Sequence, residues 1–153
     1  MKVLFICTAN VCRSPLAEGY LKHLLFSNPI PGLEVESAGV MALSGNSAFE
    51  CAAETAVLSG FDISRHKSRP LTPALAQQSD RILCMETWQA GTVMDIGPLI
   101  ASRTALLGSF HPAKGRLFQI PDPREFTVPC TLEVFSLIKH SVEGLYQKLR
   151  LQM

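Results

Sequence analysis

The stretch that decides the fold is Val3-Leu4-Phe5-Ile6 followed by Cys7-Thr8-Ala9-Asn10-Val11-Cys12-Arg13-Ser14-Pro15. The four apolar residues predict a central parallel strand that is buried on both faces. Ser14 is a preferred helix N-cap, and Pro15 at the first helical position has a backbone φ that suits a helix. We therefore expect a buried strand, a short loop and a helix that begins at Ser14 and Pro15.

The loop between this strand and helix combines groups that handle an anion. A helix N-terminus presents free N–H groups and the positive end of the helix dipole, which together favour phosphate binding. Cys7 opens the loop and Arg13 closes it. Arg13 can bind two phosphate oxygens at once, and its charge favours the thiolate form in which cysteine attacks. The pattern predicts phosphoryl chemistry on Cys7, and the competing interpretation is that Cys7 is a buried core thiol.

Length and composition restrict the class of protein. A chain of 153 residues has the size of one domain, so we predict a single domain over residues 1–153. A formal net charge of +1 gives no general attraction to nucleic acid or to a membrane. The sequence has neither an apolar run near the ~20 residues of a membrane span nor a signal peptide. Five cysteines in mostly apolar segments argue against a secreted disulfide framework, so we expect a cytoplasmic protein. Nothing in the sequence indicates an oligomeric state.

Strand and helix patterns alternate along the rest of the chain. Further strands are predicted over 33–37, 81–85 and 104–108. Helices are predicted from a capping box at Ser47, over 72–77, over 86–93 and at the end of the chain, where the apolar stripe is Phe135, Ile138, Val142, Leu145 and Leu149. Alternation of this kind implies parallel βαβ units with helices on both sheet faces. Ligands bind beyond the carboxyl ends of such strands, which is where the Cys7 loop stands.

Attack on a phosphate ester also needs a proton donor for the leaving oxygen. Asp122 is the best candidate, because Pro121 and Pro123 restrict the backbone on either side of it. The competing interpretation is an ordinary turn aspartate. Nothing in the residues around His66 makes it a catalytic base.

At this point the residues resemble a known family. Cys7 to Pro15 looks like the signature of the low-molecular-weight protein tyrosine phosphatases, and Asp122-Pro123 looks like their general-acid loop. Intermediate segments match in the same order, namely Ser37-Ala38-Gly39, Gly60-Phe61-Asp62-Ile63, His66-Lys67-Ser68-Arg69 and Arg81-Ile82-Leu83-Cys84-Met85-Glu86. The resemblance therefore runs over nearly the whole chain.

The resemblance implies a flavodoxin-like three-layer sandwich with a four-stranded parallel sheet, and neither a metal nor another cofactor. It implies a phosphocysteine intermediate on Cys7, phosphate bound by Arg13, and Asp122 as acid and then as base. The remaining phosphate-binding loop would be Thr8, Ala9, Asn10, Val11, Cys12 and Ser14, supported by Ser37 and His66. Cys12 matches a cysteine that can form a reversible, protective disulfide with the nucleophile. The expected partner is a phosphorylated protein carrying phosphotyrosine.

Two departures from the family pattern concern the substrate pocket. Family members usually carry aromatic residues directly after the Asp-Pro pair, whereas Arg124 and Glu125 stand here and Phe126 follows. The loop after Gly39 also lacks an aromatic residue but contains Met41 and Leu43. We predict that Met41, Leu43, Arg124 and Phe126 form the wall of the pocket.

Three other functions stay open on the sequence alone. Arginine phosphatases of this family typically have Thr where this chain has Val11, so Val11 favours an aryl phosphate. Arsenate reductases add a pair of neighbouring cysteines, whereas Cys84 and Cys130 are far apart in this sequence. The missing aromatic wall also permits an inactive oxyanion-binding module.

Overall fold

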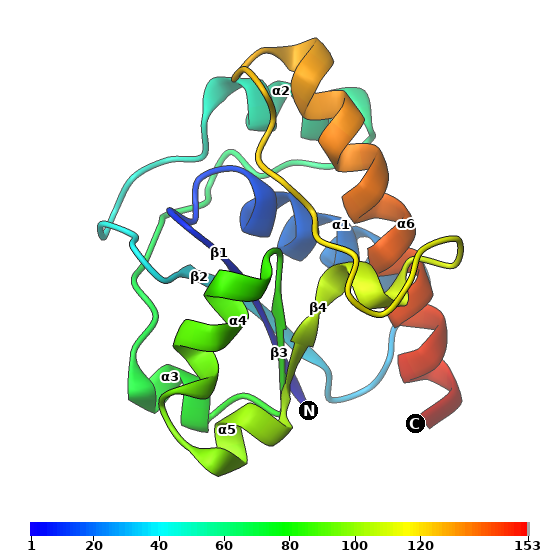
Figure 1. Cartoon of the computed structure of the whole chain (residues 1–153). Coiled ribbons are helices and arrows are strands. Elements are labelled where there is room, and N and C mark those ends of the chain that lie inside the picture. The colour runs from blue at the N-terminus through cyan, green and yellow to red at the C-terminus, as the bar shows by residue number, and fades with distance from the viewer. Residues whose placement is uncertain (153) are drawn as a thin grey trace.

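The computed structural model describes residues 1–152, in which a four-stranded parallel sheet lies between two layers of helices (Figure 1). The strands are β1 (Lys2–Cys7), β2 (Glu34–Gly39), β3 (Arg81–Cys84) and β4 (Thr104–Leu106), in the spatial order β2-β1-β3-β4. The helices are α1 (Arg13–Ser27), α2 (Glu50–Leu58), α3 (Pro73–Gln77), α4 (Thr87–Met94), α5 (Pro98–Ser102), the 3-10 helix η1 (Leu107–Phe110) and α6 (Val128–Gln152). The predicted fold class is confirmed.

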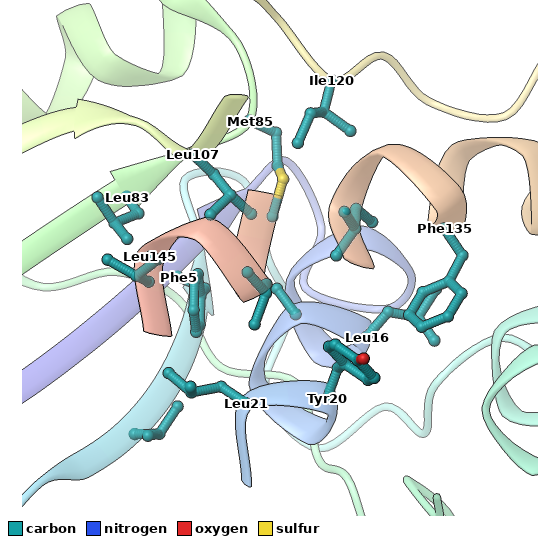
Figure 2. Close-up of a cluster of buried hydrophobic side chains, with 14 of the residues drawn as sticks. Phe5, Leu16, Tyr20, Leu21, Leu83, Met85, Leu107, Ile120, Phe135 and Leu145 are labelled. Carbon is teal, nitrogen blue, oxygen red and sulfur yellow. The ribbon is translucent and has the colours of Figure 1, made fainter. Parts of the chain in front are cut away.

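Strand β1 explains why there are two helical layers. Its residues are almost entirely buried, and their side chains alternate between the faces of the sheet. Val3 and Phe5 belong to the buried cluster that α1, α2 and α6 complete, and Figure 2 shows Phe5 among residues of α1 and α6. Leu4 and Ile6 pack instead with α3, α4 and α5. An uninterrupted apolar run is thus the pattern of a strand covered on both sides.

The predicted stripe of the last helix is confirmed, because its five apolar residues are buried in α6: Phe135, Ile138, Val142, Leu145 and Leu149. They pack against α1 and the sheet, and Phe135 meets the Tyr20 ring edge-on at 5.6 Å between centroids. None of the helices within residues 1–152 is long and apolar enough to cross a membrane.

Two predicted helix starts are wrong. Helix α1 begins at Arg13, with Cys12 rather than Ser14 at the N-cap, because the Ser14 hydroxyl contacts Cys7 instead of capping. Helix α2 begins at Glu50 with Phe49 at the N-cap, so Ser47 forms no capping box. The short α5 and η1 were not predicted, since five or fewer residues carry too little periodicity to recognise.

The carboxyl end of β1 lies at one end of the sheet, and the chain termini lie at the other (Figure 1). The loop after β2 runs beside the loop after β1, where Met41 N–H donates to the Thr8 carbonyl at 2.8 Å. A Cβ atom on Gly39 would lie 2.6 Å from that same carbonyl oxygen. Only glycine therefore permits the two loops to approach this closely.

Candidate active site

The loop after β1 has a conformation that leaves some of its backbone N–H groups available to a ligand. Asn10 adopts a φ of 58°, a left-handed conformation that asparagine tolerates better than most residues. Within residues 1–152, the backbone N–H groups of residues 9–12 donate no hydrogen bond to the protein. Free N–H groups in a loop at a helix N-terminus form an anion-binding concavity. The loop is built to receive an oxyanion.

The Cys7 sulfur lies at the base of this loop and contacts a hydroxyl. Cys7 is 3% exposed, and its Sγ atom lies 2.9 Å from Ser14 Oγ. Ser14 Oγ accepts a hydrogen bond from Asn10 Nδ2 at 2.8 Å. Because that bond uses a lone pair of the hydroxyl, the Ser14 proton is free to point at the sulfur and stabilise a thiolate.

Hydrogen bonds to both the side chain and the backbone of Asn10 fix the shape of the loop. Its Nδ2 also donates to Ser37 Oγ at 2.9 Å, and its Oδ1 accepts from Arg69 N–H at 3.0 Å. His66 Nε2 lies 2.7 Å from the Asn10 backbone oxygen. The structure thus brings Ser37 and His66 to the underside of the loop, where they contact Asn10 and not the sulfur.

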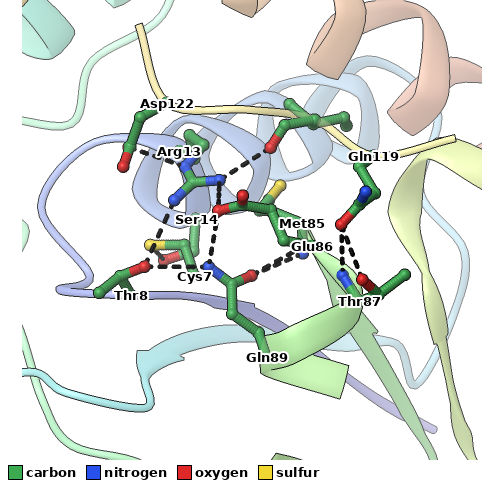
Figure 3. Close-up of polar contacts among 11 residues, drawn as sticks. Cys7, Thr8, Arg13, Ser14, Met85, Glu86, Thr87, Gln89, Gln119 and Asp122 are labelled. Carbon is green, nitrogen blue, oxygen red and sulfur yellow. Dashed lines mark hydrogen bonds and ion pairs between the residues drawn. The ribbon is translucent and has the colours of Figure 1, made fainter. Parts of the chain in front are cut away.

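Arg13 carries the only cation of the loop, and it is 1% exposed. Its Nη1 atom donates to Glu86 Oε2 at 2.7 Å and to the Ile120 carbonyl at 2.8 Å, as Figure 3 shows. Its Nε atom lies 3.0 Å from Asp122 Oδ1 but forms no aligned hydrogen bond with any partner in residues 1–152. The carboxylate of Asp122 therefore sits where an anionic ligand would lie against the guanidinium.

A cavity of about 150 Å³ opens above Cys7. Its lining brings together most of the loop with residues from two distant segments: Cys7, Thr8, Ala9, Val11, Cys12, Arg13, Phe49, Asp122 and Phe126. The structure thus places Asp122, which is 52% exposed, at the rim of the same cavity as Cys7. A buried nucleophile, a cation and a rim carboxylate can carry out displacement at phosphorus.

Comparison with known proteins agrees with this geometry. The family model described as "Low molecular weight phosphotyrosine protein phosphatase" matches residues 2–153. The chain belongs to this phosphatase family. It is 32% identical over 147 residues to the low molecular weight protein-tyrosine-phosphatase Etp of Escherichia coli K12, covering 96% of this chain and 93% of that protein.

Two solved structures show how closely the phosphatase fold is kept. Wzb of Vibrio vulnificus, solved with benzylphosphonate, has a TM-score of 0.84 and 32% identity and covers 96% of this chain and 97% of that one. The YwlE arginine phosphatase of Geobacillus stearothermophilus has a TM-score of 0.88 and 26% identity, over 99% of this chain and 94% of that one. The family is one of hydrolases.

The wall of the phosphatase pocket differs from the sequence prediction. Met41 and Leu43 are 71% and 73% exposed, and within residues 1–152 the cavity lining includes neither of them nor Arg124. Phe126 does line the cavity, and so does Phe49. Phe49 falls within the helix predicted from Ser47, and spacing alone cannot separate a ring that faces the core from one that faces a site.

Glu86 and Gln89 are polar residues of the candidate site that sequence reasoning missed. Gln89 is fully buried, and its Nε2 atom donates to Thr8 Oγ1 at 3.0 Å (Figure 3). Glu86 is the N-cap of α4 in a capping box with Gln89, so its side chain both begins that helix and contacts Arg13. The available signal was the position of Glu86, directly after a predicted strand at the same sheet edge as Cys7.

Two other thiols near Cys7, those of Cys84 and Cys12, have raised pKa values. Burial raises the pKa of the Cys84 thiol to about 12, with a smaller contribution from Cys7. Burial also raises the pKa of Cys12, and neighbouring Cys51 and Cys7 add to the rise. Neither thiol will ionise near neutral pH. All five cysteines, which lie within the described residues, are free thiols.

Proposed function

We propose that the protein is a metal-independent cysteine phosphatase that hydrolyses phosphotyrosine in proteins through a phosphocysteine intermediate. The observation that carries this proposal is the shared cavity of Cys7, Arg13 and Asp122, beside the free N–H groups of residues 9–12. The loop amides and the guanidinium supply the positive potential that a phosphate dianion requires, and they do so from the chain's own residues.

In the first step, the phosphate of the substrate enters the loop and takes the place of Asp122 against Arg13 Nε. The Cys7 thiolate attacks phosphorus in line with the leaving oxygen, and the new S–P bond replaces the O–P bond. Asp122 donates its proton to the leaving oxygen, which departs as a phenol. Arg13 and the loop N–H groups bind the three equatorial oxygens, where charge is spread in the transition state.

In the second step, water attacks the phosphocysteine and Asp122 accepts the proton of that water. The S–P bond breaks, inorganic phosphate forms, and the Cys7 thiolate leaves with the Ser14 hydroxyl beside it at 2.9 Å. A hydrogen bond to a leaving thiolate lowers the barrier to its departure. The enzyme returns to its starting state with no net change in its own protonation.

Cys7→Ser is the direct test of this mechanism. A serine hydroxyl is a much weaker nucleophile, so we expect turnover of para-nitrophenyl phosphate to fall below detection, while Cys130→Ser, at the surface start of α6, keeps wild-type activity. Wild-type activity should persist in excess EDTA and be inhibited by vanadate. Full activity of Cys7→Ser, or its loss in EDTA, would overturn the proposal.

The role of Asp122 is tested by changing the leaving group. Asp122→Ala should reduce kcat by roughly 10²–10⁴ for phenyl phosphate, which needs a proton, and far less for para-nitrophenyl phosphate, which does not. Asp95→Ala, at an exposed carboxylate after α4, is the control. An equal reduction for both esters would remove Asp122 from the acid role.

Protein-arginine phosphatase is the second candidate, favoured by the similarity to the YwlE structure. Phosphotyrosine is preferred because a relative of higher identity was solved with an aryl-bearing phosphonate and because Val11 lines the cavity with methyl groups. Parallel turnover of phosphotyrosine and phosphoarginine peptides decides between the two. A larger kcat/KM for phosphoarginine would reverse the order.

Arsenate reduction and passive oxyanion binding have less support. A reductase needs a thiol that can attack Cys7, whereas burial keeps Cys84 protonated. A passive binder has no use for a carboxylate at the rim of the cavity. We also propose that residues 1–153 act as one domain, which the family match over residues 2–153 supports. We further propose that the protein works in the cytoplasm, because that compartment keeps thiols such as these reduced.

A further inference from the structure

Two phenylalanine rings stand at the mouth of the cavity above Cys7. Phe49 and Phe126 lie edge to face, with ring centroids 4.9 Å apart and an interplanar angle of 81°. Phe126 comes from the loop that carries Asp122, and Phe49 comes from the segment directly before α2. Both rings stay largely in contact with solvent, at 41% and 52% exposure, so neither is a core residue.

Phe49 is attached directly to the phosphate-binding loop. Its backbone N–H donates to the Val11 carbonyl at 2.8 Å. The backbone of a loop residue thus sets the height of the ring above Cys7. The loop that binds the phosphate therefore also holds Phe49 in position, and a residue that selects substrates needs such a fixed position.

Phe49 also occupies a position for which phenylalanine is locally a poor choice. It is the N-cap of α2, and it makes no side-chain hydrogen bond to the helix. Ser, Thr, Asn or Asp at an N-cap satisfies a free N–H group and stabilises the helix, whereas a phenyl ring satisfies none. An exposed ring at a capping site adds little to folding, and residues that break a local rule concentrate at functional sites.

We propose that Phe49, paired with Phe126, forms the wall that receives the aryl ring of the substrate in this chain. This step rests on the proposed phosphatase function and names the substrate class, an aryl phosphate monoester. Arg124 and Glu125 stand where an aromatic residue is expected after Asp122-Pro123, and Phe49 supplies an aromatic surface beside Phe126 from the segment before α2.

The side chains around the cavity fit a phenyl ring. The phosphate occupies the part of the cavity that Cys7 and Arg13 line, so the ring lies beside the half-exposed Phe49 and Phe126. Aromatic rings gain from edge-to-face contact in addition to the area they bury. An alkyl phosphate has no ring to place there. A phosphoarginine side chain would instead rely on a cation–π contact, which makes it the competing occupant.

The test uses Phe49→Ser, because serine is a good N-cap. The variant should keep or raise the melting temperature while the inhibition constant for benzylphosphonate rises roughly tenfold, the scale of a lost ring contact. The inhibition constant for inorganic phosphate, which contacts only the loop, should change less than twofold. Phe49→Tyr should restore benzylphosphonate binding. Phe26→Ser, at a ring 90% exposed in the last turn of α1, is the matched control.

Each alternative outcome overturns the inference in a different way. Equal weakening of phosphate and benzylphosphonate would make Phe49 a support of the loop and not a wall. If neither inhibitor bound more weakly, Phe49 would not be part of the substrate pocket. If Phe49→Ser lost more phosphoarginine turnover than phosphotyrosine turnover, the group that Phe49 contacts would be the guanidine of phosphoarginine and not an aryl ring. Both inhibitors are also titrated by calorimetry. A wild type that binds them without turning over any ester refutes the proposed function while still testing Phe49.

Discussion

The floor and the rim of the site are built in opposite ways. The floor consists of buried polar side chains that hold one another, with Asn10, Ser14 and Ser37 almost fully buried. The rim consists of half-exposed side chains from separate segments, namely Asp122, Phe126 and Phe49. Each floor residue is fixed by hydrogen bonds, whereas the two rim rings are half exposed and contact each other edge to face.

This difference separates the reaction from the choice of substrate. A buried polar network tolerates little change, because each group that loses its partner remains buried and unsatisfied. An exposed aromatic pair can be replaced at small cost to folding. Variants of the floor should therefore affect every substrate and the stability together, whereas variants of the rim should affect only substrates with a group that reaches it.

Asn10→Ala should have the largest effect. Alanine disfavours the left-handed conformation, removes the hydrogen bonds that Asn10 donates to Ser14 and Ser37, and leaves the Arg69 N–H without its partner. We expect the free energy of unfolding to fall by about 2–4 kcal/mol and kcat to fall at least a hundredfold for aryl and alkyl esters alike. Urea titration and steady-state kinetics measure both. The exposed Asn46→Ala serves as the control, and a variant that loses only aryl turnover would contradict a shared floor.

Glu86→Ala should have the next largest effect, because Glu86 joins the floor to α4. Its carboxylate holds Arg13 Nη1 at 2.7 Å, and it is 24% exposed. Without it, Arg13 loses a fixed orientation, so kcat should fall roughly tenfold to a hundredfold while KM changes less. Glu86→Gln keeps a hydrogen-bond acceptor and should recover much of kcat. If Glu86→Gln were no more active than Glu86→Ala, Glu86 would contribute its charge and not the orientation of Arg13. The exposed Glu54→Ala on α2 is the control.

Alkaline pH should destabilise the sheet beneath the site through a buried thiol on β3. Burial raises the pKa of Cys84 from 9.0 to about 12, so between these values the unfolded chain releases a proton that the folded chain keeps. The unfolded state then binds fewer protons, and stability falls as pH rises, by up to about 1.4 kcal/mol per pH unit for this thiol. Urea titrations from pH 8 to 11 measure the slope. Cys84→Ala should reduce this slope but leave the part that the buried Cys12 contributes, and an unchanged slope would show that other groups cause the loss.

The sequence predicted the floor far better than the rim, for physical reasons. Strand β1 is apolar on both faces and the loop residues are contiguous, so local pattern was sufficient to find Cys7, Asn10 and Arg13. Only the helix cap predicted at Ser14 was wrong, because a serine before a helix has the sequence pattern of a cap whether its hydroxyl points to the helix or to a sulfur. Phe49 joins Phe126 only through the folded arrangement of α2 and the last loop. No spacing in the sequence encodes that pairing.

The smallest expected effect is the coupling between the two rings of the rim. An edge-to-face pair contributes about 0.5–1.5 kcal/mol beyond buried area, and exposure of both rings places this pair at the low end. A double-mutant cycle of Phe49→Leu and Phe126→Leu removes the pair while keeping apolar bulk. In the free protein we expect a coupling of about 0.5 kcal/mol in the free energy of unfolding. With bound benzylphosphonate the coupling should increase, because the ligand ring contacts both side chains. A coupling that is the same with and without the ligand would mean that the two rings contact each other but not the substrate.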